Sequence, residues 1–227
     1  MALPSLSLFA GCIYDTASQI QQQKDIYTMA RKYGDANAAR SALFNLIVLH
    51  PKDSSWLDSL FLFYCDTRSY PQAVMLGNEL IKKSPDDTTT RELLAISKQS
   101  LGLLKEALDD YEILLKATGK SAYLYQIATI QYNLKRVEEC AVSIERLLAM
   151  PDIENENVLI QYGQNQNLQQ RVPIKAAAYN IKGVLARDIG NKDVAVESFQ
   201  KALEVFPDFE LAKGNLETLR PAESNRQ

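Results

Sequence analysis

The stretch "GNKDVAVESFQKALEVFP", residues 190–207, contains a regularly spaced set of small, aromatic and proline residues. After Gly190, the marked residues follow at gaps of five, four, three and five positions: Ala195, Phe199, Ala202 and Pro207. Gaps of four and three place Ala195, Phe199 and Ala202 on one face of a helix. Gly190 favours a left-handed turn, and Pro207 prevents the helix from continuing. The stretch therefore predicts a turn, a helix and a stop.

The same gaps recur earlier in the chain at a nearly constant spacing. The positions equivalent to Ala195 are held by Ala39, Ala73, Ala107 and Cys140. The three alanines are evenly spaced, and Cys140 follows the last of them after an interval that is shorter by one position. The interval from Cys140 to Ala195 is longer than the others, so the last repeat is preceded by an insertion. A fixed period is typical of repeat proteins, in which each unit packs on its neighbours.

The spacing of Ala39, Ala73 and Ala107 equals the tetratricopeptide period of about 34 residues, and the chain resembles that family over about residues 20–219. The last repeat matches most fully, because the family's aromatic, glycine, alanine and proline places are held by Tyr179, Gly183, Gly190, Ala195, Phe199, Ala202 and Pro207. Two places depart from the family, since Lys182 replaces the usual Leu and Ala186 the usual Tyr. The resemblance implies an all-α, right-handed α-solenoid of about five helix pairs, with repeats at about 20–53, 54–87, 88–120, 121–151 and 176–209.

Two segments after the fourth repeat need a separate interpretation. The insertion spans 152–175, and its alternating positions are Val158, Ile160, Tyr162, Leu168, Gln170 and Val172. Alternation on both sides of "GQNQN" favours a β-hairpin near 157–172, and the alternative is a polar loop that extends a helix. Residues 209–219 predict a capping helix that packs on the last repeat, followed by a flexible tail at 220–227.

Composition and charge exclude several classes of function. The 227 residues, 46% hydrophobic and 23% charged, fit one soluble globular or repeat unit. With a net charge of −3, the chain has no basic field to attract nucleic acid. No apolar run approaches the roughly 20 residues of a membrane-spanning helix. The single histidine, and the lack of a CxxC pair or a glycine-rich phosphate loop, predict no metal site, no cofactor and no catalytic centre.

Residues 1–19 are predicted to be an N-terminal arm or a signal-like remnant. "MALPSLSLFAGC" resembles the end of a secretory signal, and "LFAGC" resembles a lipoprotein box whose Cys12 would carry a lipid anchor. The segment lacks Lys and Arg, and Pro4 interrupts it. A truncated start would explain these features, as would a short apolar arm packed on the first helix. Both a cytoplasmic and an extracytoplasmic (periplasmic or secreted) location therefore stay open.

The family resemblance implies a non-catalytic scaffold that binds a peptide or protein segment in a concave groove lined by the first helix of each pair. Register with the family places the following candidate partner-binding residues there: Tyr125, Tyr132, Arg187, Asn180, Lys24 and Arg31. Exposed tyrosines and arginines are common interface anchors. The alternative for either tyrosine is that it packs between neighbouring helices.

The residues at the groove positions also test for one specialised form of the groove, the carboxylate clamp. Chaperone-binding members of the family hold a terminal carboxylate with inward Lys, Asn and Arg, but the matching places here hold Asp58, Leu62 and Leu93. A carboxylate clamp is therefore not expected.

Two alternative functions stay open. One alternative function is an extracytoplasmic lipoprotein or secreted component of a cell-envelope assembly. The second is an accessory domain of an enzyme with a carboxylate and tyrosine site in the groove.

Overall fold

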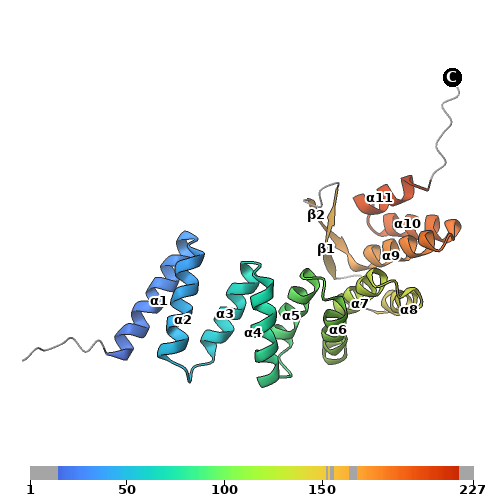
Figure 1. The fold of residues 1–227 in the computed structure, drawn as a ribbon. Helices are drawn as coiled ribbons and strands as arrows, with labels where there is room; N and C mark the ends of the chain where they lie inside the picture. Colours follow the sequence, from blue (N-terminus) through green and yellow to red (C-terminus); the bar gives the residue numbers. More distant parts are fainter. Residues whose placement is uncertain (1–14, 152, 154–155, 164–167, 220–227) are drawn as a thin grey trace, which may run out of the picture. The chain divides into compact units, whose positions relative to one another are not determined.

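The computed structural model describes residues 15–151, 153, 156–163 and 168–219. Over these residues the chain forms five consecutive helix pairs, one hairpin and a final helix (Figure 1). The helices are α1 (Thr16–Tyr33), α2 (Ala36–Leu49), α3 (Ser55–Asp66), α4 (Tyr70–Lys83), α5 (Thr88–Ser100), α6 (Leu104–Thr118), α7 (Ser121–Asn133), α8 (Val137–Leu148), α9 (Ile174–Asp188), α10 (Lys192–Val205) and α11 (Glu210–Glu217). The predicted all-α fold of five helix pairs with a final helix is confirmed.

The chain divides into two compact units, with the boundary between Pro85 and Asp86. The first unit contains α1 to α4, and the second contains α5 to α11 together with the hairpin. α1 begins at Thr16, ahead of the predicted repeat start at 20. The signal-like segment with Cys12 and the predicted tail at 220–227 lie outside the described residues. Within the described part of the chain, no helix combines the length and hydropathy needed to cross a membrane.

One backbone conformation recurs in the turn inside each helix pair. Gly34, Gly102 and Gly190 have φ angles of 74°, 75° and 82°, in the left-handed region that glycine adopts at least cost. Arg68 and Lys135 occupy the same place in the second and fourth pairs, with φ of 55° and 60°. In all five turns the next amide donates to the carbonyl five positions earlier, as in a Schellman motif. The repeat position therefore imposes this backbone even where the residue is not glycine.

The repeated small residue of each pair is completely buried. Ala39, Ala73, Ala107, Cys140 and Ala195 are each 0% exposed. In the fourth pair the thiol of Cys140 donates to the carbonyl of Ala128 across the two helices, at 3.3 Å. Burial raises the pKa of this thiol to about 11, so it remains protonated and packs as a small apolar group. Small side chains at this position allow the two helices of each pair to approach closely.

The insertion forms the predicted β-hairpin, and the alternative of a polar loop is wrong. β1 (Asn157–Tyr162) pairs antiparallel with β2 (Leu168–Pro173). The register sets Val158 opposite Val172, Ile160 opposite Gln170 and Tyr162 opposite Leu168, so the alternating residues share one face. In the side chain of Gln170, Nε2 donates to the backbone carbonyl of Asp208, and Oε1 accepts the backbone N–H of Glu210. The hairpin is thereby joined to the start of α11.

The first helix of the second unit begins at a carboxylate cap. Asp87 accepts the backbone N–H groups of Thr89 and Thr90 at 3.0 and 3.1 Å, and the Thr90 hydroxyl at 2.7 Å. The Thr90 hydroxyl contributes most to lowering the pKa of Asp87 below its ordinary value of 3.8, and the two backbone bonds add to it. The cap is therefore strongest when Asp87 is ionised.

We expect Asp87→Ala to lower the free energy of unfolding by about 1 kcal/mol near neutral pH, the usual effect of losing such a cap. Asp86→Ala is the matched control, because the exposed Asp86 does not cap α5. Since folding lowers the pKa of Asp87, its contribution is complete above pH 3.8 and is lost as the pH falls through the folded-state pKa. Urea titrations at several pH values test this, and a wild-type advantage that persists in strong acid would contradict it.

Candidate functional site

In the second unit, polar side chains of the first helices lie close to the helix-pair crossings. α5, α7 and α9 are the first helices of the three pairs in this unit. Gly183 of α9 lies directly against Phe199 of α10, and Ala128 of α7 lies against Cys140 of α8. Tyr132 follows Ala128 by four positions and Arg187 follows Gly183 by four, so both lie about one helical turn beyond a crossing, on nearly the same side of the helix. Their polar groups reach beyond the helix pair that contains them.

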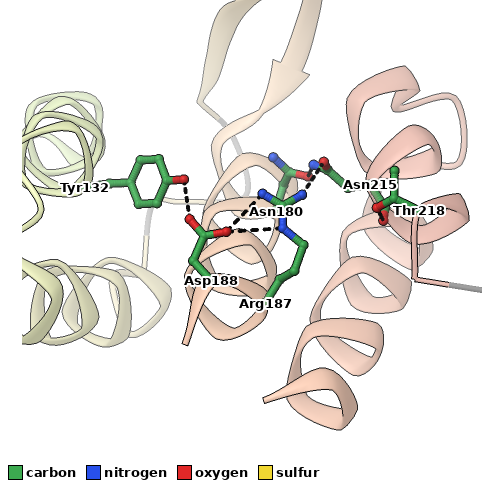
Figure 2. Close-up of polar contacts among 6 residues, drawn as sticks. All are labelled: Tyr132, Asn180, Arg187, Asp188, Asn215 and Thr218. Atoms are coloured by element: carbon green, nitrogen blue, oxygen red, sulfur yellow. Dashed lines mark hydrogen bonds and ion pairs between the residues drawn. The ribbon is translucent and has the colours of Figure 1, made fainter. Parts of the chain in front are cut away.

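Five polar side chains from three helices form one connected group, shown in Figure 2. We call it the polar belt, and it consists of Tyr132 on α7, Asn180, Arg187 and Asp188 on α9, and Asn215 on α11. The Tyr132 hydroxyl donates to Oδ2 of Asp188 at 2.6 Å. Nε and Nη2 of Arg187 donate to Oδ1 of the same carboxylate at 3.2 and 3.1 Å. Asp188 thus joins a tyrosine of one pair to an arginine of the next.

The polar belt continues from Arg187 to the final helix. Nη1 of Arg187 donates to Oδ1 of Asn215 at 3.2 Å, and Nδ2 of Asn215 donates to Oδ1 of Asn180 at 2.9 Å. The Thr218 hydroxyl donates to the backbone carbonyl of Asn215 at 2.7 Å and so holds the end of α11 (Figure 2). One chain of hydrogen bonds therefore connects α7, α9 and α11, which fixes the rotamers of all five side chains.

The protonation states in the polar belt are well defined near neutral pH. The hydrogen bond from Tyr132, followed by those from Arg187, lowers the pKa of Asp188. Burial, followed by the hydrogen bond to Asp188, raises the pKa of Tyr132. The ammonium group of Lys135 lies 5.1 Å from the centre of the Tyr132 ring, within cation–π range. The side chains of Arg187 and Asp188 are 33% and 35% exposed, so a partner can reach this ion pair.

A second polar group connects α5 with α7 in the same unit. The Tyr123 hydroxyl donates to Oε2 of Glu92 at 3.0 Å. Gln99 donates to Gln126 at 3.5 Å and accepts the hydroxyl of Tyr111 at 3.1 Å. Burial and the bond to Glu92 raise the pKa of Tyr123 to about 12. The first helices of all three pairs are thus linked by polar side chains.

The structure brings together three of the six predicted partner-binding residues. Tyr132, Arg187 and Asn180 belong to the polar belt, where Asn180 is only 5% exposed. Tyr125 is 9% exposed on α7, and burial raises its pKa to about 12. Its ring therefore packs inside the unit and offers a partner little surface.

The other two predicted residues, Lys24 and Arg31, lie on α1 in the first unit. The ammonium group of Lys24 is 5.3 Å from the centre of the Trp56 ring. Nη2 of Arg31 is 2.9 Å from Oδ2 of Asp66, with both side chains exposed. Both residues connect the first helix pair to the second through contacts that water also reaches.

Sequence reasoning missed two members of the polar belt, Asp188 and Asn215. Asp188 directly follows Arg187 at the end of α9. Its position next to a predicted site residue was the one signal that could have pointed to it. Asn215 follows Asn180 at close to one repeat period, but it belongs to a helix that was interpreted only as a cap. No single-residue pattern marks either of them as a partner for Arg187.

The described residues contain no cluster of buried carboxylates. Among the described buried residues Asp110 is the only carboxylate, and it lies between α5 and α6. Its Oδ1 accepts Nη1 of Arg91 at 2.8 Å, and its Oδ2 accepts Nζ of Lys98 at 2.6 Å. Because cations hold both oxygens, this carboxylate does not form an acid–base pair with another. No group of three or more His, Cys, Asp or Glu residues in the described ranges is arranged to hold a metal ion.

Comparison with known proteins agrees with the arrangement of helices. Residues 176–209, which contain α10 and most of α9, match the family model described as tetratricopeptide repeat. This segment is a tetratricopeptide repeat. The matched pair is the one whose sequence pattern is most complete, with Gly183 and Phe199 in contact at its crossing. No curated protein matches the chain in sequence.

Solved structures of several proteins, among them YrrB, share the fold of this chain. A crystal structure of MamA has a TM-score of 0.63 and 16% identity, with 83% of this chain and 92% of that chain covered. The structure of YrrB, described as a TPR protein with an unusual peptide-binding site, has a TM-score of 0.63 and 14% identity, covering 89% and 98%. MamA from Desulfovibrio magneticus RS-1 has a TM-score of 0.62 and 13% identity, covering 85% and 97%. At these identities the likeness establishes the fold alone.

Proposed function

We propose that this protein is a non-catalytic scaffold, and that it binds a peptide or partner-protein segment in a concave groove lined by its first helices. The polar belt of the second unit is the main contact in this proposal. The observation that carries it is the fixed, half-exposed arrangement of Tyr132, Arg187 and Asp188. Because hydrogen bonds already hold these side chains, binding would cost little of the ordering entropy that an interface usually requires.

The chemistry of the polar belt suits a polypeptide ligand. A peptide backbone presents donors and acceptors in alternation, and Arg187, Asp188 and Asn215 supply both kinds of group. Tyrosine and arginine are also the residue types that most often carry binding energy at interfaces. The description of YrrB as peptide-binding supports the same class of ligand for a protein of this fold. Since the charges of Arg187 and Asp188 compensate each other, we expect binding to depend weakly on salt.

The test starts from peptides selected against the purified full chain by phage display. Their affinities are then measured by fluorescence anisotropy for the wild type, Arg187→Ala and Tyr132→Phe. We expect Arg187→Ala to weaken binding about tenfold or more, a loss of about 1.4 kcal/mol at least, as is usual for a central arginine. Tyr132→Phe keeps the ring but removes the donor to Asp188, and should weaken binding less.

Arg171→Ala provides the matched control, because this exposed arginine lies on β2 outside the polar belt. It should leave the affinity unchanged. Thermal unfolding followed by circular dichroism establishes that each variant is folded before its affinity is compared. Selected peptides that bind Arg187→Ala and Tyr132→Phe as tightly as the wild type would exclude the polar belt as the binding surface.

A further inference from the structure

A pocket in the second unit shares no residue with the polar belt. It has a volume of about 400 Å³ and is lined by residues of α6, α7 and α8. Its apolar lining consists of Leu115, Leu124 and Ile127, and its polar lining of Glu112, Lys116, Gln131, Ser143 and Arg146. The volume lies within the range of pockets that hold small ligands or single side chains.

The wall of this pocket contains a buried acceptor without a donor. Gln131 is 6% exposed, and its Oε1 is buried without a hydrogen-bond partner among the described residues. Buried polar atoms in folded proteins nearly always have a partner, because leaving one unpaired is costly. Gln131 also lines an open pocket, so a small rotation of its side chain would present this acceptor to an N–H or O–H group of a ligand.

Positive charge lies at the same pocket. Lys116 on α6 and Arg146 on α8 are both exposed, and neither forms an ion pair with any residue that the structure describes. Glu112 is the only carboxylate among the lining residues, so the two cations exceed the acidic charge by one. The pocket thus presents a buried acceptor together with cations that would attract an anionic group.

We propose that this pocket binds an acidic residue within a partner's polypeptide. The backbone N–H of that residue donates to Oε1 of Gln131, and its carboxylate meets Lys116 and Arg146. A glutamate or aspartate in a peptide is the simplest ligand that carries a donor and an anion a few bonds apart. Its methylene groups would contact Leu124 and Ile127. The proposal rests on the proposed scaffold function only in taking the ligand to be a polypeptide, and it concerns a different surface.

The experiment uses the full chain labelled with ¹⁵N and three capped tripeptides. The probe is acetyl-Ala-Glu-Ala-amide, and the controls are its Gln counterpart and a Glu peptide methylated on the glutamate nitrogen. We expect the probe, at millimolar concentration, to shift the side-chain amide of Gln131 and backbone amides of α6 to α8. The Gln control, which lacks the charge, and the methylated control, which lacks the donor, should each bind at least fivefold more weakly. If free glutamate binds as tightly as the probe, the pocket is instead a small-molecule site, and the proposed ligand class is overturned.

Variants separate a binding role for Gln131 from a structural one. Gln131→Leu should weaken the binding of the probe at least fivefold. It should also raise the thermal midpoint of unfolding of the free protein, because the unpaired buried acceptor is gone. Lys116→Ala and Arg146→Ala should abolish the preference for Glu over Gln, whereas Lys105→Ala, an exposed lysine elsewhere on α6, should preserve it.

Three results would overturn the proposal: no shift with the probe, equal affinity for the Glu and Gln peptides, or a lowered thermal midpoint in Gln131→Leu with unchanged binding. Arg187→Ala in the polar belt should leave the tripeptide affinity unchanged. The two proposals can therefore fail separately, since each depends on its own variants.

Discussion

Replacing Asp110 with Ala is expected to destabilise the second unit by about 3–5 kcal/mol, which is the usual cost of removing one partner from a buried ion pair. Asp110 is 5% exposed, and Arg91 and Lys98, which donate to its two oxygens, are 8% and 7% exposed. The substitution removes the carboxylate that both cations share and leaves the cations in place. Their charges are shielded poorly by the surrounding protein, so the loss is large.

Urea denaturation of the full chain, followed by circular dichroism, measures this effect. The informative control replaces the whole group with apolar residues, as Arg91→Met, Lys98→Met and Asp110→Leu together. That triple variant should be far more stable than Asp110→Ala, because no charge remains buried. If Asp110→Ala costs less than about 1 kcal/mol, the group is solvated and the buried ion pair contributes little.

Gly183→Ala is expected to lower the stability of the second unit by about 2 kcal/mol, although alanine normally stabilises a helix by about 1 kcal/mol relative to glycine. A Cβ atom at this position would lie 2.5 and 2.6 Å from ring carbons of Phe199. Phe199 is 0% exposed, so its ring cannot move aside without disturbing the packing around it. The added methyl group can therefore be accommodated only if α9 moves away from α10, and this movement reduces the contact between the two helices.

Gly214→Ala is the matched control for this substitution. Gly214 is also helical, but nothing lies within 4 Å of the Cβ that would be added. This variant should gain about 0.5–1 kcal/mol from helix propensity alone. A double-mutant cycle with Phe199→Leu should show that Gly183→Ala costs less when the ring is absent. Equal effects of the two Gly→Ala substitutions would contradict the close helix crossing.

The helix pairs and the hairpin could be predicted from sequence because local spacing encodes them. Small residues at a constant period mark the pair crossings, and the same period places Arg68 and Lys135 at left-handed turns. Alternation of side chains across "GQNQN" predicted which hairpin residues share a face, and the register agrees. In each case the relevant residues are close in the chain, so the steric demands of one turn or one strand pair determine the pattern.

The candidate site could be predicted only in part. Register within the repeat singled out Tyr132, Arg187 and Asn180, which the structure brings together. Register could not distinguish the buried Tyr125 from the half-buried Tyr132, because both occupy first-helix positions of the same repeat. The belt member Asn215 comes from a helix with its own packing pattern, and its bond to Asn180 joins residues that are far apart in the chain.

The sequence by itself determined the order of the helix pairs, their turns and the hairpin, since these depend on the sizes and backbone preferences of residues a few positions apart. Only the tertiary structure decided which polar groups meet. The ion pair of Arg91 with Asp110 and the bond of Tyr132 to Asp188 join separate helices, and the acceptor of Gln131 is unpaired because no neighbouring helix among the described residues supplies a donor. Hydrogen bonds and ion pairs act over a few ångströms in space, so their partners emerge only when the helices have packed.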